Sequence, residues 1–264
     1  MRSGLTFQGA NARLQVYLFF LRHESQASIR QWLVAESLRR FSDAKKAASD
    51  NMVVILRCAK KGDAMQEPPR PRIGKPEDSE LITEVVTLSF VADPLWSWAM
   101  SRDDKRNHHN SLIWALFVDG ALRYSSSWIF GNGEAVSVWI SPGGSEMSAD
   151  QESRLRDCVN ETLGDRASRF FDLLAQMEDS HPRDEDHFYL SLLGTYPNSR
   201  GKGVGMQLLS HDLDLIDAQH RAAYLESSNP NNDDRYQSAG FEAFGQFRAP
   251  NGGPTVTTMW RSAR

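Results

Sequence analysis

Apolar residues recur at helical spacing in several segments of this 264-residue chain. Leu81, Val85 and Leu88 would share one face of a helix. Residues 76–79, just before them, are acidic and able to cap, which favours a helix start. Residues 148–151 have the spacing of a capping box and predict the start of another helix. Further helices are expected over 105–116, 166–177, 203–219 and 233–238.

Apolar runs bounded by turn residues predict strands in the same part of the chain. The expected strands are 122–130, 135–140, 187–195, 223–226, 241–247 and 255–260. The first two are joined by Gly131-Asn132-Gly133, a hairpin signal because these residues tolerate positive φ. The last two flank Gly252-Gly253 and should be antiparallel neighbours. This order of helices and strands predicts an α/β fold with a mixed sheet.

The N-terminal part of the chain differs from the rest. Residues 1 to about 65 mix short apolar runs with a basic amphipathic stretch. The proline-rich stretch 66–72 should break regular structure, because proline removes a donor and fixes φ. We therefore place a boundary there, with 1–69 as a poorly ordered extension, or an overlong start ahead of Met65. The folded domain is then 70–264.

The composition excludes several classes of protein. Charged residues make up 24% of the chain, and the net charge of −4 argues against a nucleic-acid-binding protein. The two cysteines, Cys58 and Cys158, match no metal-ligand spacing. The longest early apolar run, 16–21, is too short to span a bilayer. We expect a soluble, cytoplasmic protein without a metal, a membrane or a nucleic-acid partner.

A glycine-rich turn between a predicted strand and helix carries the strongest chemical signal. Residues 200–205 read Arg-Gly-Lys-Gly-Val-Gly. Glycines let the backbone approach a ligand closely. The unpaired amides of a helix's first turn form an anion site, and a pyrophosphate is the expected occupant. Arg200 and Lys202 add positive charge at its rim.

Three phosphate-binding motifs can be compared with this turn. A P-loop needs serine or threonine after its glycine-lysine pair, and Gly203 stands there. A dinucleotide fingerprint needs a third glycine where Met206 stands, although Glu226 fits its acidic position. The pattern Arg-x-x-Gly-x-Gly after an apolar strand matches in full. A tight turn without a ligand is the structural alternative.

The stretch 193–205, which contains this turn, resembles the acyl-CoA motif of the GNAT superfamily of N-acetyltransferases. Residues 224–241 are similar to the region that carries the family's tyrosine and closing Gly-Phe. Within the superfamily, 135–139 and 224–227 resemble puromycin N-acetyltransferase-like proteins of actinomycetes. The motifs cover the last third of the chain well and 70–180 only loosely. The resemblance implies a mixed, mostly antiparallel sheet with a splayed strand pair, flanked by helices.

The resemblance also implies roles for individual residues. Tyr236 matches the general acid that protonates the coenzyme sulfur, although it could simply pack behind Phe241. Asn229 and Asn232 match polar positions that hold the coenzyme or cap a short helix. The backbone groups that would bind acetyl-CoA belong to the strand end and the turn: Leu193, Gly194, Thr195, Arg200, Gly201, Lys202, Gly203, Val204 and Gly205.

The general base is not evident from the sequence. Asp186, His187 and Glu226 are candidates, and deprotonation through ordered water is an alternative. Trp96 and Trp98 lie where the superfamily builds its acceptor pocket, so they predict either an aromatic wall or ordinary core.

Two histidine groups invite other interpretations. His108 and His109 are adjacent in a predicted helix, where their side chains would point apart, so we expect a polar face and no metal site. His211, Asp214 and Asp217 have helical spacing and predict a solvated face.

The sequence therefore predicts transfer of an acetyl group from acetyl-CoA to the primary amine of a small molecule. Attack would be direct, without a covalent enzyme intermediate. A non-catalytic acyl-CoA-binding sensor is the alternative, because no base is obvious. A homodimer, the identity of the amine and the acyl chain preference are left open.

Overall fold

The computed structural model describes residues 69–100 and 106–264. The expected extension 1–69 lies outside this part of the chain apart from its last residue, and so does Cys58. The boundary near residue 69 therefore stays a prediction.

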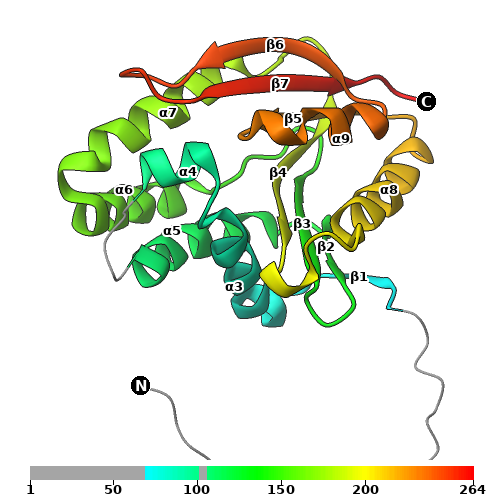
Figure 1. The fold of residues 1–264 in the computed structure, drawn as a ribbon, viewed down its shortest axis with the longest axis horizontal. Coiled ribbons are helices and arrows are strands. Elements are labelled where there is room, and N and C mark those ends of the chain that lie inside the picture. The colour runs from blue at the N-terminus through cyan, green and yellow to red at the C-terminus, as the bar shows by residue number, and fades with distance from the viewer. Residues whose placement is uncertain (1–68, 101–105) are drawn as a thin grey trace, which may run out of the picture. The chain divides into compact units, whose positions relative to one another are not determined.

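Seven strands form a single sheet in the order β1-β2-β3-β4-β5-β7-β6 (Figure 1). Only β4 and β5 pair in parallel, so the sheet is mixed and mostly antiparallel, as expected. The strand bounds are β1 Pro71–Ile73, β2 Ser127–Phe130, β3 Ala135–Ile140, β4 His187–Thr195, β5 Ala222–Ser227, β6 Glu242–Arg248 and β7 Thr255–Arg261.

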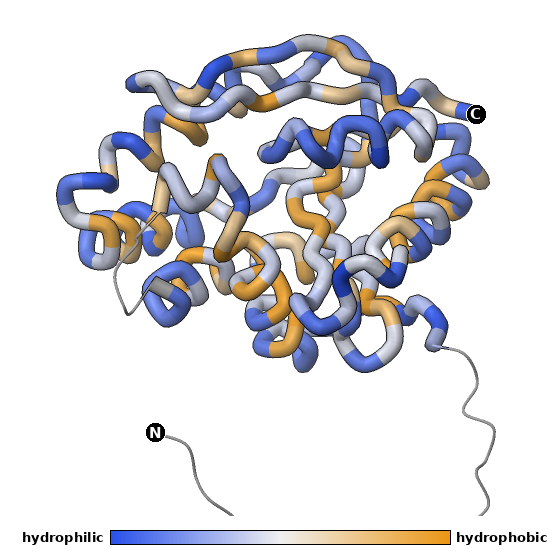
Figure 2. Tube along the Cα trace, viewed as in Figure 1, coloured by the Kyte–Doolittle hydropathy of each residue, from blue (hydrophilic) through white to orange (hydrophobic). Residues whose placement is uncertain are grey.

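Helices cover both faces of this sheet. One core cluster joins α3, α5, α6 and α7 to Val136, Val138 and Leu192, and another joins α8 to Trp139 and Leu190. Figure 2 shows hydrophobic segments recurring along α8, and the buried residues of this helix include three leucines. The helix bounds are α3 Ser79–Phe90, α4 Pro94–Ala99, α5 Arg106–Ala121, α6 Ala149–Leu163, α7 Ala167–Ser180, α8 Val204–Asp217 and α9 Asp233–Ser238, with 3-10 turns η1 Pro76–Asp78, η2 Gly164–Arg166, η3 Pro197–Ser199 and η4 Pro230–Asn232.

The bounds of several predicted elements, one turn and one helix cap are confirmed. β3, β4 and α9 have the bounds of their predicted segments. The hairpin turn between β2 and β3 contains Gly131 and Gly133 at φ 59° and 105°, which only glycine adopts without strain. The capping box at the start of α6 is formed, with Gln151 N donating to Ser148 Oγ at 3.3 Å and Ser148 N donating to Gln151 Oε1 at 3.0 Å.

Three expectations about local structure are wrong. The strand expected over 122–130 begins only at Ser127, because α5 runs on to Ala121 and buries Val118 and Ala121. The proline-rich segment was expected to break regular structure, yet Pro71 opens the edge strand β1, where a missing donor does no harm. Helix α4 was not predicted, and Asp93 caps it by accepting from the backbone of Leu95 at 3.0 Å.

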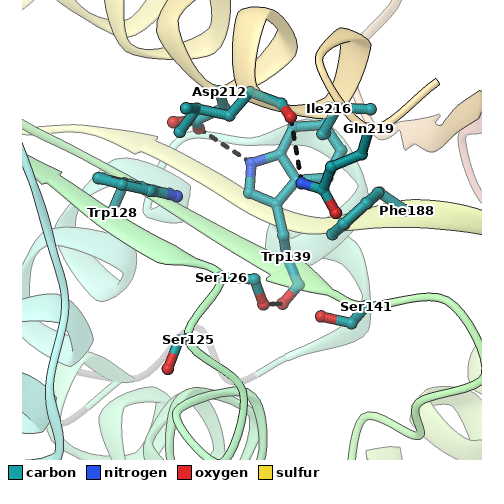
Figure 3. Close-up of a pocket in the computed structure, with 10 residues that line it drawn as sticks. Ser125, Ser126, Trp128, Trp139, Ser141, Phe188, Asp212, Ile216 and Gln219 are labelled. Carbon is teal, nitrogen blue, oxygen red and sulfur yellow. Dashed lines mark hydrogen bonds between the residues drawn. The ribbon is translucent and has the colours of Figure 1, made fainter. Parts of the chain in front are cut away.

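Asp212 ties α8 to the sheet from inside the core. Its carboxylate accepts a hydrogen bond from Trp139 Nε1 at 2.9 Å (Figure 3). Ser137 Oγ donates to the same oxygen at 2.5 Å. His211 Nδ1 lies 3.0 Å from the other oxygen and packs edge-on against Trp128. The expected solvated face holds for Asp214 but not for His211.

The remaining member of that predicted face also has a partner. Asp217 accepts two hydrogen bonds from Arg261, at 2.5 and 2.7 Å, and this pairing lowers the pKa of Asp217. The bond fixes the end of α8 to β7 because Arg261 itself is buried.

Candidate functional site

The central feature of the site is a fork between β4 and β5. The two strands pair from His187 with Ala222 to Leu190 with Leu225, and no pairing follows beyond that point. A register shift between Val138 and Trp139 leaves Ser191 without a partner on β3. The last five residues of β4 therefore have an edge that β5 does not cover. The splayed strand pair expected from the resemblance is confirmed.

The glycine-rich turn follows directly at the open end of β4. Gly201 and Gly203 have φ of 76° and 75°, and Gly203 is the N-cap of α8. A Cβ built on Gly201 would meet no protein atom within 4 Å, so space in front of the turn is open. A Cβ on Gly205 would lie 2.5 Å from Thr195 Oγ1, so a larger residue there would have to displace the Thr195 hydroxyl.

The charged residues of the turn differ in their surroundings. Arg200 donates to the carbonyl oxygen of Ser89 at 2.7 Å, which ties the turn to the end of α3. Ser89 Oγ in turn donates to the Thr195 carbonyl at 3.0 Å. Lys202 is exposed. Arg200 is thus engaged in positioning the turn, whereas Lys202 is available to a ligand.

Tyr236 lies on the opposite side of the fork, on α9. The short helix is anchored at its first residue, where Asp233 accepts from Ser227 Oγ at 2.6 Å and Thr257 Oγ1 at 2.9 Å. Burial raises the pKa of Tyr236 to about 12, with a contribution from the charge of Asp93. The phenol therefore keeps its proton near neutral pH and can donate it. It also packs edge-on against Phe241, so both interpretations of Tyr236 fit its position.

The two predicted asparagines serve the turn before α9. Asn229 Oδ1 accepts from the backbone N–H of Asn231 at 3.1 Å, and Asn232 Oδ1 accepts from Arg235 at 3.0 Å. Both contacts shape the local backbone. A role of either side chain toward a coenzyme stays a prediction.

A cavity of about 930 Å³ begins at the closed end of the fork. β4 contributes Tyr189, Ser191 and Leu192 to its lining. Its apolar wall consists of Trp96, Trp114 and Phe117. A cavity of this size accepts a small organic molecule. The aromatic wall expected from Trp96 is present, whereas Trp98 is absent from the lining and packs under Arg169.

The main chemical group of this cavity is Glu146, which sequence reasoning missed. Its carboxyl group is partly buried and accepts a hydrogen bond of 2.5 Å from Ser191 Oγ. Burial raises the pKa of Glu146 to about 7; the Ser191 hydrogen bond lowers it, and the charge of Glu226 raises it. A carboxylate that titrates near neutral pH at the fork is suited to take a proton from an amine.

The bases proposed from the sequence occupy different environments. Asp186 lines the cavity, but its side chain is 73% exposed and lies 3.9 Å from Arg221, so it is far less enclosed than Glu146. His187 is buried and contacts the ring of Trp260, and burial lowers its pKa. Glu226 lines the cavity, with a side chain that is only 2% exposed. Burial and the charge of Glu226 raise the pKa of Tyr189 well above its usual range.

A smaller cavity of about 230 Å³ lies beneath α8 (Figure 3). Asp212 is its acidic residue, and both of its oxygens already have partners in Ser137, Trp139 and His211. Because this carboxylate serves the packing of α8, the cavity at the fork is the better candidate site.

No protein-family model matches the chain. Among solved structures, an acetyltransferase from Corynebacterium glutamicum, described as a histone acetyltransferase and related acetyltransferase, superposes with a TM-score of 0.53. The two are 21% identical over 75% of this chain and 97% of that one. The chain has the fold of the GNAT acetyltransferases.

Two further structures share this GNAT fold. Arylalkylamine N-acetyltransferase 2 from Aedes aegypti has a TM-score of 0.52 and 17% identity, over 74% of this chain and 99% of its own. An agmatine N-acetyltransferase variant has a TM-score of 0.51 and 12% identity, over 74% of this chain and all of its own. The predicted GNAT-type fold is thus confirmed, whereas the closer resemblance to puromycin N-acetyltransferase-like proteins stays a prediction.

The described residues form neither a metal site nor a membrane span. Across 69–100 and 106–264, no three or more His, Cys, Asp or Glu side chains gather in a way that could hold a metal ion. No helix in the same ranges has the length and apolar character needed to cross a membrane.

Proposed function

We propose that this protein is an N-acetyltransferase that moves the acetyl group of acetyl-CoA to the primary amine of a small molecule. The observation that carries the proposal is Glu146. Its carboxyl group, which has a raised pKa, is bonded to Ser191 just beyond the point where β4 and β5 separate, and it lines a cavity large enough for an amine. The glycine-rich turn lies at the other end of the same uncovered strand edge.

The uncovered edge of β4 would orient the donor substrate. The backbone groups of Leu193 and Gly194 are free of β5, so they can pair with an extended ligand as a further strand would. The amides at the start of α8 would bind the diphosphate. An amide aimed at the thioester carbonyl would stabilise the oxyanion, which is worth roughly 3 kcal/mol of barrier.

Glu146 and Tyr236 would then move the two protons of the reaction. Glu146 accepts a proton from the acceptor's ammonium group, which otherwise has a pKa near about 10.4. The free amine attacks the thioester carbon, so that a C–N bond forms and the C–S bond breaks. Glu146 passes this first proton to solvent. Tyr236 donates its phenolic proton to the departing thiolate, and the proton that the nitrogen of the new amide loses then returns to the Tyr236 phenolate, so that both residues regain their starting protonation.

The test is release of free CoA thiol from acetyl-CoA over a panel of primary amines. Thiol release that requires an amine, together with an N-acetylated product by mass spectrometry, is the expected result. Binding of acetyl-CoA without turnover on any amine would support the sensor instead. Binding of NAD(P) in place of CoA would contradict the assignment of the glycine-rich turn.

A further inference from the structure

A second polar locus in the large cavity lies across the fork from Glu146. The side chain of Glu226, on β5, is 2% exposed, and its Oε1 has no hydrogen-bond donor among the described residues. His181 Nδ1, at the end of α7, lies 3.9 Å from this oxygen. Both residues line the cavity. A buried carboxylate oxygen without a donor is destabilising, so a ligand that donates a hydrogen bond to it would be bound favourably.

Hydrogen bonds assign which nitrogen of the histidine next to Glu226 is the acceptor when its ring is neutral. His187 Nδ1 lies 2.7 Å from the backbone carbonyl of Glu185, which can only accept, so this nitrogen carries the proton. His187 Nε2 is then an acceptor in the neutral ring. It lies 3.1 Å from His181 Nε2, which must donate. The neutral His181 ring therefore keeps its lone pair on Nδ1, facing Glu226.

With a neutral His181 ring, Nδ1 and Glu226 Oε1 are two acceptors 3.9 Å apart. Tyr189 and Tyr224 also interact with the Glu226 carboxylate, but Oε1 has no donor among the described residues. A nitrogen bearing several protons can bond to both at once, and an ammonium group also matches the charge of the carboxylate. The walls of this locus suit a cation. The rings of Tyr189 and Tyr224 lie 4.9 and 4.8 Å from the ring of His181 and hold it in place. Aromatic faces add cation–π attraction.

The charges around the cavity favour the same kind of ligand. Acidic side chains outnumber guanidinium groups in its lining, and Glu178 forms an ion pair of 2.8 Å with Arg183. The acidic lining residues are Glu146, Glu152, Glu178, Glu185, Asp186 and Glu226, against Arg156 and Arg183. A cavity lined in this way attracts molecules with more than one positive charge.

We propose that Glu226 and His181 bind a second ammonium group of the acceptor, so that the preferred acceptors are small diamines. The reacting amine lies at Glu146, and the distal one lies between Glu226 Oε1 and His181 Nδ1. This inference rests on the proposed function for its catalytic readout, but the distal site binds whether or not transfer occurs.

The first experiment compares linear diamines of two to six carbons with n-alkylamines of the same length. The expected kcat/KM is about tenfold to a hundredfold higher for the best diamine, the range expected for a hydrogen bond to a charged group. Glu226→Gln should bring this ratio close to one. His181→Phe, which keeps a ring against Tyr189 and Tyr224 but removes the acceptor, should lower it several-fold. Glu161→Gln removes the same charge from the exposed surface of α6 and should leave the ratio within twofold.

Calorimetric binding of the best diamine separates this inference from the proposed function. Diamine binding that weakens in Glu226→Gln, with no turnover on any amine, would support the distal site and contradict the enzyme. Equal kcat/KM for diamines and monoamines, or an unchanged ratio in folded Glu226→Gln protein, would overturn the distal site and leave the enzyme in place.

Discussion

The pH dependence of Glu146 tests the proposed base most sharply. Its pKa of about 7 reflects burial, which raises it, opposed by the hydrogen bond from Ser191, which lowers it. The acid limb of kcat/KM reports groups of the free enzyme, so activity should reach half its plateau near pH 7. Glu146→Gln should lose this limb, and its turnover should fall by about 10²- to 10⁴-fold, the usual contribution of a general base.

Ser191→Ala should move the acid limb of the kcat/KM profile to higher pH. A hydrogen bond to a charged group contributes about 1.5–3 kcal/mol, and one pH unit corresponds to about 1.36 kcal/mol. Because the lost bond favoured the ionised form of Glu146, its pKa should rise by about one to two pH units. Ser126→Ala removes a buried serine hydroxyl that donates to the Trp139 carbonyl at 2.7 Å instead, and should leave the limb in place.

The assay is thiol release at saturating acetyl-CoA, with one amine varied at each pH from about 5.5 to 9. Two results would refute the reasoning. A midpoint in Ser191→Ala equal to that of the wild type would show that Ser191 does not tune the base. A retained limb in Glu146→Gln would show that another group titrates, with Glu226 as the next candidate.

Three other predictions follow from the same geometry. Tyr236→Phe should reduce turnover at least tenfold while CoA affinity, measured by calorimetry, stays nearly the same; lost affinity with normal turnover would contradict its role as the acid. Gly203→Val should weaken CoA binding at least tenfold, whereas Gly252→Val, with the same φ of 75° in the β6–β7 turn, should not. Glu146→Gln should raise the free energy of unfolding at pH 8 by up to about 3 kcal/mol. The pKa of the wild-type carboxyl group is 4.5 in the unfolded chain and about 7 in the folded protein, so the wild-type protein loses stability as the pH rises between these two values. Thermal unfolding at pH 5 and pH 8 checks this, and an equal pH dependence in the two proteins would count against it.

The parts of the fold that follow local rules could be predicted from the sequence. The turn at Gly131–Gly133 and the turn at 200–205 both depend on positive φ, which glycine signals directly. β4 is a long apolar run that ends at Thr195, two residues before Pro197, and its bounds were predicted from the sequence. Helix α4 was missed, although Asp93 followed by Pro94 is an N-cap followed by a favoured first residue.

The catalytic part of the site depends on contacts between distant segments. Glu146 lies in an irregular stretch between β3 and α6, where no periodicity indicates its burial. Burial raises its pKa, and its hydrogen-bond partner Ser191 lies 45 residues away in the chain. The locus at Glu226 likewise needs His181, which ends α7. Sequence reasoning identified Glu226 as a candidate from its strand alone, but it could not identify the partners that give either carboxylate its chemistry.

The central claim is that the glycine-rich turn binds the coenzyme. Titration of acetyl-CoA into the purified full-length chain tests this claim most directly. We expect saturable binding at one site per chain, weakened by Gly203→Val and followed by amine-dependent thiol release. Absence of heat and of any change in melting temperature with acetyl-CoA, longer acyl-CoA or free CoA would contradict the proposed function.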